Sequence, residues 1–122
     1  FFQAAIAGNH IGIYGDGKQT RDFTFISDAV AANLAAALVP EAVGEVFNIG
    51  GGSRVVLLDV LDTMAKVIGK PIERSHQGLA RGDARHTAAD VTKARTILGY
   101  NPQVSLAEGL AQEWQWIQEL YC

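Results

Sequence analysis

The sequence predicts a mixed α/β fold, built as one lobe, on three observations. Apolar residues recur at helical spacing in several segments, and short β-branched or aromatic runs lie between them. Hydrophobic residues make up 48% of the 122 residues and charged residues 19%, which is enough apolar surface for a core. Helical and strand-like segments alternate along the chain, as they do in domains that pack helices against strands.

The first elements predicted are a helix and two strands. Apolar residues within positions 1–6 form the face of a helix that begins without a cap, so we expect the chain to be part of a longer protein. Residues 11–14 (IGIY) predict a strand that ends in a Gly-Asp-Gly turn, because glycine tolerates the positive φ that such turns need. Residues 23–26 (FTFI) are aromatic and β-branched and predict a second strand.

A helix and a third strand are expected next. Ser27 or Asp28 is predicted to cap a helix whose apolar residues fall on one face and which ends before Pro40. Residues 45–50 (EVFNIG) predict a strand. The glycines at 50–52 then predict a loop that leaves this strand.

The rest of the chain predicts three helices and one further strand. Helical periodicity is clear over residues 58–68 and again over residues 91–98. Residues 72–76 (IERSH) predict a strand between these two helices. Ser105 and Glu108 have the spacing of a capping box, which predicts the start of a final amphipathic helix.

Net charge and cysteine content exclude several classes of protein. The formal charge of −3 gives no bulk attraction to nucleic acid or to an acidic membrane, so we expect neither partner. The single cysteine, Cys122, excludes an internal disulfide and indicates a reducing, cytoplasmic setting. No apolar run is long enough to span a membrane. The three histidines lack metal-ligand spacing, so we expect no metal site.

Residues 14–18 (YGDGK) place a tyrosine and a lysine four positions apart, which is the spacing of an oxidoreductase acid/base pair. That pair works on a helix, where positions i and i+4 share a face and the lysine lowers the pKa of the tyrosine. Here Gly-Asp-Gly stands between the two residues and breaks any helix. We interpret the spacing as accidental and expect no catalytic residue in this chain.

Two glycine-rich stretches resemble phosphate-binding loops but lack the neighbours that such loops need. Residues 12–18 approach a P-loop, but Gln19 stands where serine or threonine would hold magnesium, and no helix is expected to follow. Residues 50–52 lack the G-x-G-x-x-G spacing of a dinucleotide fingerprint. We interpret them as a connector between a strand and a helix.

Five arginines stand in or beside the loops between the expected elements. Guanidinium forks bind pyrophosphate oxygens at two points, and loops at strand ends are where α/β proteins place ligands. The same arginines could form local ion pairs, as Arg21 with Asp22 would, and spacing alone favours this second interpretation. The five are Arg21, Arg54, Arg74, Arg81 and Arg85.

Three stretches of the chain together resemble a known family. They are IYGDGKQTRDFTFISDAVAANLAAAL, EVFNIGGGS and RGDARHTAADVTKARTILGYNPQVSLAEGLAQEWQWI. Their order and spacing are similar to the C-terminal part of the NAD-dependent sugar-nucleotide epimerases and dehydratases. These enzymes are extended short-chain dehydrogenases, typified by UDP-glucose 4-epimerase, and the resemblance covers essentially the whole chain.

The resemblance implies a division of labour. Residues 1–122 would be the nucleotide-sugar-binding C-terminal domain, a mixed α/β lobe from which the Rossmann domain is largely absent. The missing N-terminal domain would bind NAD, supply the catalytic residues and form a homodimer, so this chain alone would be inactive. The whole enzyme would oxidise the sugar transiently with NAD and then reduce it again.

The resemblance leaves the outcome of the reaction open. An epimerase similar to UDP-glucose 4-epimerase is the first expectation. A sugar-nucleotide 4,6-dehydratase of the same family is the alternative, in which the keto intermediate loses water. A reductase of the same superfamily, or a binding module, would keep the scaffold without recognising a diphosphate.

The resemblance also assigns substrate contacts around the 11–22 stretch. Tyr14 would pack on the nucleotide base, and Gly12 and Ile13 would offer backbone groups beside it. Arg21, the arginine of the R-D-F triplet, would meet the diphosphate. Asp22 would orient Arg21 as its neighbour.

A second set of contacts is implied for the R-G-D region. Asp83 would meet the ribose. The family places its second diphosphate arginine three residues before this aspartate, where this chain has Ala80, so Arg81, one place closer, takes that role. Thr87 stands where some members have a tyrosine that contacts the base.

Overall fold

The computed structural model describes residues 1–121. Cys122, on which the expectation of a reducing setting rests, lies outside the described residues. The elements are α1 (Phe2–Ile6), β1 (Ile11–Tyr14), β2 (Thr20–Asp22), α2 (Ile26–Leu38), a 3-10 helix η1 (Pro40–Ala42), β3 (Arg54–Val56), α3 (Leu57–Ile68), β4 (Arg74–Gln77), α4 (Thr92–Leu98) and α5 (Leu106–Tyr121). None of the described helices has the length and hydropathy needed to cross a membrane.

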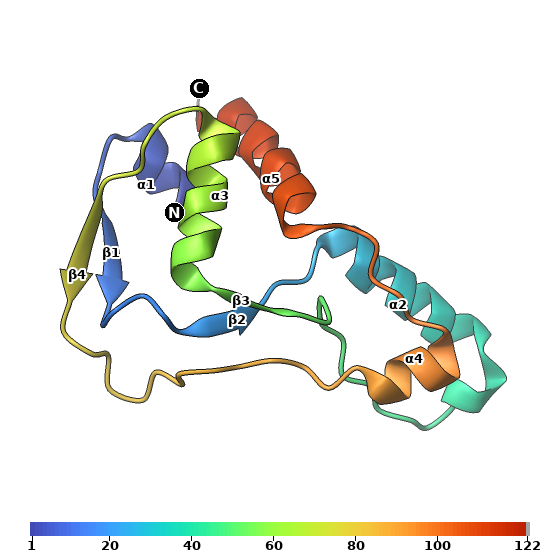
Figure 1. The fold of residues 1–122 in the computed structure, drawn as a ribbon. Helices are drawn as coiled ribbons and strands as arrows, with labels where there is room; N and C mark the ends of the chain where they lie inside the picture. Colours follow the sequence, from blue (N-terminus) through green and yellow to red (C-terminus); the bar gives the residue numbers. More distant parts are fainter. Residues whose placement is uncertain (122) are drawn as a thin grey trace.

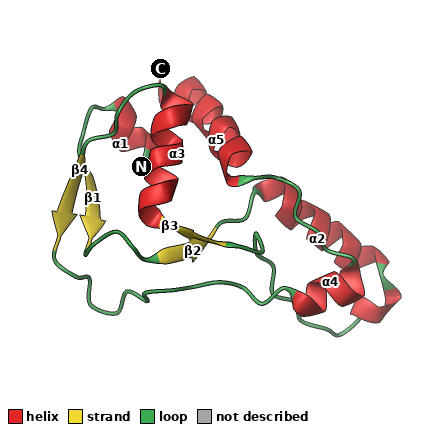
Figure 2. Ribbon diagram, in the orientation of Figure 1, coloured by secondary structure: helices red, strands yellow, loops and turns green. Residues whose placement is uncertain are grey.

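The elements form two groups that are joined by long connections (Figure 1). One group holds α1, β1, β4, α3 and α5, and the other holds α2 and α4. The short strands β2 and β3 lie between the groups, as the view by secondary structure also shows (Figure 2). The mixed α/β fold class predicted from the sequence is therefore confirmed.

The predicted helices are confirmed because their signals are local. The helix expected over 58–68 is α3, and the helix expected over 91–98 is α4. The capping box is also confirmed, since the backbone N–H of Ser105 donates to Glu108 Oε2 at 3.0 Å. The Glu108 N–H donates in return to Ser105 Oγ at 3.3 Å.

The strand predicted over 23–26 is wrong. Residues 23–25 have no regular structure, and α2 begins at Ile26 with Phe25 at its N-cap. Neither Ser27 nor Asp28 caps this helix, because both already lie inside its first turn. The carboxylate of Asp28 instead accepts the backbone N–H groups of Gln103 (2.9 Å) and Val104 (3.2 Å), so it ties α2 to the segment before α5.

The strand predicted over 45–50 is also wrong, since these residues have no regular structure. A strand needs a partner for its backbone groups, and no described strand lies alongside this segment. The pair formed by β2 and β3 was not predicted, because three residues are too few for an alternating pattern. The strand expected over 72–76 is present but shifted, as β4 over 74–77.

The parallel pairing of β1 with β4 decides where the loops of the site emerge. Ile11 pairs with Arg74, and Tyr14 pairs with Gln77. Because the two strands run in the same direction, their carboxyl ends meet at one edge. The loops 15–19 and 78–85 both leave from this edge.

Two separate apolar clusters hold the lobe together. The first lies between β1, α3 and α5, where the rings of Phe2 and Trp114 approach with centroids 5.4 Å apart. The second lies between α2, η1 and α4, where the buried hydroxyl of Tyr100 donates to the Gly50 carbonyl at 2.7 Å. The buried members are Phe2, Ile11, Ile13, Val60, Leu61, Met64, Ile72 and Leu110 in the first cluster, and Ala32, Ala42, Val91, Ala94, Leu98 and Tyr100 in the second.

One face of α2 is apolar and open to solvent. Ile26, Val30, Leu34 and Leu38 follow one another at intervals of four residues, which places them on the same side of the helix. Their exposed fractions run from 48% to 80%. The inward side of α2 is built from alanines such as Ala32, which pack in the second cluster.

This apolar face predicts that the 122-residue chain binds a hydrophobic dye such as anilinonaphthalene sulfonate or associates with itself, because contiguous exposed apolar surface is a docking liability. Leu34→Ser should lower the dye fluorescence. Leu79→Ser, which removes an even more exposed leucine (86% against 61% for Leu34) away from α2, serves as the control and should change it little. A monomer that binds no dye would contradict the prediction.

Candidate functional site

The turn after β1 is rigidly built and presents Tyr14. Gly15 and Gly17 have positive φ angles of 68° and 74°, which a residue with a side chain rarely adopts. The side chain of the buried Gln19 donates from Nε2 to the Tyr14 carbonyl at 3.1 Å. The Tyr14 side chain itself is 52% exposed, so its ring is free to meet a ligand at the strand's carboxyl end.

Gly12 and Ile13 lie within β1, beside the strand β4. The side chain of Ile13 is buried in the first apolar cluster. It is therefore unable to touch a ligand, and only backbone groups are available here. The predicted role of these two residues was a backbone role, and it stays a prediction.

Arg21 and Asp83 form an ion pair across 62 residues of sequence. Both side chains are about one-third exposed, at 29% and 35%. The second arm of the guanidinium, Nη1, donates to the Thr20 carbonyl at 2.8 Å. The two residues predicted to meet diphosphate and ribose are thus brought together, with the Asp83 carboxylate on the arginine fork.

The prediction of a local ion pair between Arg21 and Asp22 is wrong. The Asp22 carboxylate accepts the backbone N–H groups of Gly51 at 2.8 Å and Ala89 at 3.3 Å. Successive residues of a strand point to opposite faces, so Asp22 faces away from the Arg21 side chain. Asp22 therefore joins two loops and does not orient Arg21 directly.

Arg81 and Thr87 lie on either side of Asp83. Arg81 is an exposed residue in a turn that is closed by the Asp83 N–H donating to the Ala80 carbonyl at 3.2 Å. Asp83 contacts Arg21, and Arg81 stands two residues before Asp83 in the chain. The N–H of Thr87 donates to the Thr20 carbonyl at 3.2 Å.

Thr87 also lines an open cavity of about 290 Å³, close to the lower limit of small-molecule sites. The polar groups of this cavity are few, and the Asp22 carboxylate among them is already bonded to backbone N–H groups. The other lining residues are Asp22, Thr24, Ile49, Gly50, Ala88 and Ala89.

Asp16 and Arg85 form a second ion pair that sequence reasoning missed. Arg85 donates from Nη1 to Asp16 Oδ1 at 2.6 Å and from Nη2 to Asp16 Oδ2 at 2.9 Å. The Lys18 N–H donates to Asp16 Oδ1 at 2.9 Å. The hydrogen bonds from Arg85 and then from Lys18 hold the pKa of Asp16 far below its ordinary value. The sequence marked Arg85 as a loop arginine, but it presented Asp16 only as a turn residue.

The Asp16 carboxyl should titrate well below the ordinary value of 3.8, and Arg85→Gln should move its pKa back up. A depressed pKa in the folded state stabilises the fold at a pH above the ordinary value, and this contribution is lost as the pH falls below it. Carbon-detected NMR titration of the aspartate carboxyls measures this directly. An unchanged Asp16 pKa in Arg85→Gln would contradict the assignment.

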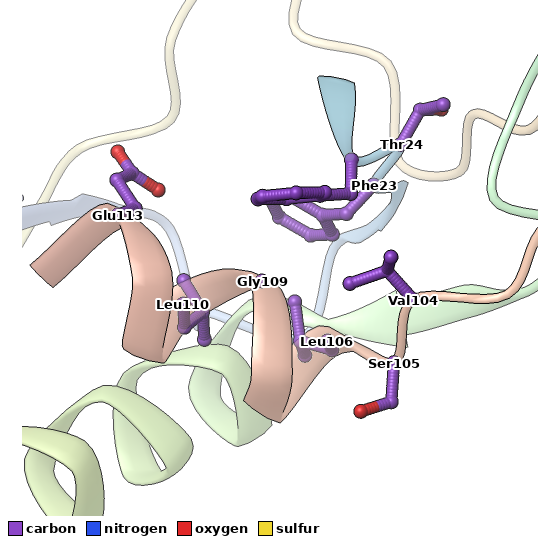
Figure 3. A pocket seen from close by; sticks show the side chains of 9 residues that line it. Phe23, Thr24, Val104, Ser105, Leu106, Gly109, Leu110 and Glu113 are labelled. Atoms are coloured by element: carbon purple, nitrogen blue, oxygen red, sulfur yellow. The ribbon is translucent and has the colours of Figure 1, made fainter. Parts of the chain in front are cut away.

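A smaller apolar cavity lies where the residues after β2 meet the start of α5 (Figure 3). Its volume is about 90 Å³, room for a few water molecules and far below the size of a nucleotide. Phe23, Leu106 and Leu110 are among its lining residues, so its surroundings are those of a packing gap.

The glycine loop at 50–52 is not arranged as a dinucleotide-binding loop. The N–H of Gly51, which a dinucleotide loop would aim at pyrophosphate, donates to Asp22 instead. A Cβ added to Gly51 would lie 1.9 Å from the Phe23 carbonyl oxygen, so this glycine serves close packing within the chain. NAD therefore does not fit the glycine loop at 50–52.

The fold places the chain in the class of sugar-nucleotide epimerases and dehydratases. UDP-glucuronic acid 4-epimerase from Bacillus cereus, in complex with UDP-glucuronic acid and NAD, matches with a TM-score of 0.92 and 37% identity over 98% of this chain and 38% of that chain. The family model described as GDP-mannose 4,6 dehydratase matches residues 2–113. The chain belongs to this family, which confirms the resemblance inferred from the sequence.

Curated relatives agree with this assignment. UDP-glucose 4-epimerase of Mycolicibacterium smegmatis is 38% identical over 92% of this chain and 36% of its own length. dTDP-glucose 4,6-dehydratase of Xanthomonas campestris pv. campestris is 33% identical over 92% of this chain and 34% of its own length. The chain thus spans about a third of the length of the curated relatives it matches.

Proposed function

We propose that this chain binds the nucleotide-diphosphate half of a sugar nucleotide within a longer NAD-dependent sugar-nucleotide 4-epimerase. The observation that carries the proposal is the meeting of Arg21, on β2, with Asp83 of loop 78–85. Arg81 lies on the same loop as Asp83, and the exposed Tyr14 ends β1, directly before loop 15–19. Similar proteins whose structures contain UDP-sugars support the proposal.

Each residue has a distinct task in this proposal. The guanidinium of Arg21 exchanges the Asp83 carboxylate for diphosphate oxygens, which carry more charge and match the fork at two points. Arg81 adds a second positive charge to the same group. Asp83, once released, accepts hydrogen bonds from the ribose hydroxyls. Tyr14 stacks on the base, since an exposed ring at a strand end offers a flat apolar face.

The redox chemistry belongs to the rest of the full-length protein in this proposal. NAD supplies transient oxidation of the sugar when it is bound there, and catalytic side chains come from the same part. The described residues hold and orient the substrate, and the chain by itself is inactive. The full-length protein forms a homodimer through the part outside this chain.

A 4,6-dehydratase is the second candidate. Two findings favour it: the description of the matching family model, and the dehydratase among the relatives. The diphosphate contacts are shared by both candidates, so they differ in what happens to the sugar. A reductase or binding module without diphosphate recognition is a third candidate, and it would not respond to UDP.

Calorimetric titration of the full-length protein with UDP, dTDP and GDP tests the proposal, and uridine is the matched control without a diphosphate. We expect UDP to bind more tightly than uridine by at least about tenfold, because charge-assisted bonds to the diphosphate are lost with uridine. Equal affinities for the two would contradict diphosphate recognition. NMR of the products from UDP-glucose then separates inversion at C4 from loss of water.

A further inference from the structure

Loops 15–19 and 78–85 separate at the end of the β1–β4 pair and meet again beside β2 (Figure 1). Three backbone and side-chain contacts join them there. The Thr20 N–H donates to the Arg85 carbonyl at 2.9 Å, and the Thr87 N–H donates to the Thr20 carbonyl at 3.2 Å. The Thr20 hydroxyl and Nδ1 of His86 share a hydrogen bond of 2.8 Å.

Arg85 is held at both of its ends. Its carbonyl is bonded to Thr20, and both of its Nη atoms are bonded to the Asp16 carboxylate. Asp16 is itself fixed, because its Oδ1 accepts the Lys18 N–H within the same turn. The ion pair therefore connects two ordered pieces of backbone, which distinguishes it from a pair between two loose side chains.

We propose that Asp16 and Arg85 are positioning residues: they form a brace that sets Arg21 and Asp83 in place for the diphosphate without touching it. Thr20, bonded to the Arg85 carbonyl, directly precedes Arg21. Asp83 stands two residues before Arg85 on the other loop. Arg21 thus lies one residue from Thr20, and Asp83 lies two residues from Arg85, which are the positions that the brace holds. This inference rests on the proposed function.

Arg85 differs from Arg21 in how its guanidinium is bonded: Arg21 gives only one arm to a carboxylate and the other to the Thr20 carbonyl, whereas Arg85 gives both arms to one carboxylate. Both arms of its guanidinium are occupied by a carboxylate that is held ionised, since its pKa lies far below the neutral range. Arg81 is an exposed residue in the turn that is closed by the Asp83 N–H. On these contacts we assign Arg85 to the brace, and we keep Arg21 of β2 and Arg81 as the proposed diphosphate contacts.

A double-mutant cycle with Asp16→Asn and Arg85→Gln in the full-length protein tests the brace. We expect each single variant to raise the Kd for UDP about fivefold, the upper range for a partly exposed ion pair. The double variant should cost no more than either single one, because both break the same contact. The KM for a UDP-sugar should rise by the same factor while kcat is kept, which a general loss of folding would not produce.

Lys93→Gln is the matched control. The Lys93–Glu45 pair has side chains that are each 45% exposed, against 49% and 50% for the Arg85–Asp16 pair, but Lys93 lies in α4, in the other group of elements. We expect this variant to leave the Kd for UDP unchanged. A Kd that rises equally in the control would overturn the brace, since it would reflect surface charge alone.

Backbone amide NMR of Asp16→Asn without ligand separates the brace from the proposed function. The amide signals of Thr20, Arg21 and Asp83 should shift if the pair sets the two loops. If the signals shift but the protein does not bind UDP, the loop contact is supported and the proposed function has failed. That outcome overturns the role of the pair in positioning the ligand contacts. Unshifted signals, or additive changes in the Kd, would overturn the brace while leaving UDP binding intact.

Discussion

Arg21→Ala should weaken UDP binding by the full-length protein about ten- to a hundredfold. The guanidinium is the group that we assign to the diphosphate, and a charge-assisted hydrogen bond is worth roughly 1.5–3 kcal/mol. In the free protein the fork is held by Asp83 and by the Thr20 carbonyl, so it is positioned before the ligand arrives. Binding exchanges the Asp83 contact for the diphosphate, so the loss of that ion pair offsets part of the gain.

Arg54→Ala is the matched control for this substitution. Arg54 lies on β3, directly opposite Asp22 of β2, so its side chain points to the face away from Arg21. It is an exposed arginine on the same two-stranded pair. Isothermal titration should show a weaker affinity for Arg21→Ala only. Equal UDP affinities of Arg21→Ala and the parent protein would refute the assignment.

Asp28→Ala should lower the free energy of unfolding by about 3 kcal/mol. The Asp28 carboxylate is only 6% exposed and accepts two backbone N–H groups from residues 103 and 104. Removing it leaves both part-buried N–H groups without this partner, and an unpaired buried group costs about 1–3 kcal/mol. It also removes a negative charge from the first turn of α2, where the helix dipole favours one.

Asp59→Ala provides a close comparison for Asp28→Ala. Asp59 is the third residue of α3, as Asp28 is the third residue of α2, but it is exposed. Its replacement should cost well under 1 kcal/mol, the scale of a dipole interaction at the surface. Urea denaturation of the 122-residue chain measures both values. Similar losses for the two variants would show that the link to residues 103 and 104 contributes little.

The sequence predicted elements well where the signal is contained within the element. The periodicity of α3 and the capping box of α5 are local, and both were confirmed. Residues 45–50 have strand propensity, but a strand forms only where a partner pairs with its backbone. Asp28 had the residue type of a helix cap, and its actual contacts lie 75 residues away in sequence.

In the candidate site, too, the sequence pointed to individual residues but not to contacts between residues far apart in the chain. The resemblance singled out Arg21, Asp83 and Tyr14, and the structure brings Arg21 and Asp83 into contact. It could not supply the partner of Asp16, because Arg85 stands 69 residues further along the chain. The parallel pairing of β1 with β4 creates both meetings, and no local pattern encodes that register.

The separation of the apolar residues into two clusters implies that the lobe does not open as a unit. Deuterium uptake should be slowest in α3, whose Leu61 and Met64 lie at the centre of the larger cluster. The shorter α4, packed largely against alanines, should exchange at a lower free energy of opening. Partial unfolding would thus release the α2–α4 end first, while β1 and β4, beside the larger cluster, stay in register.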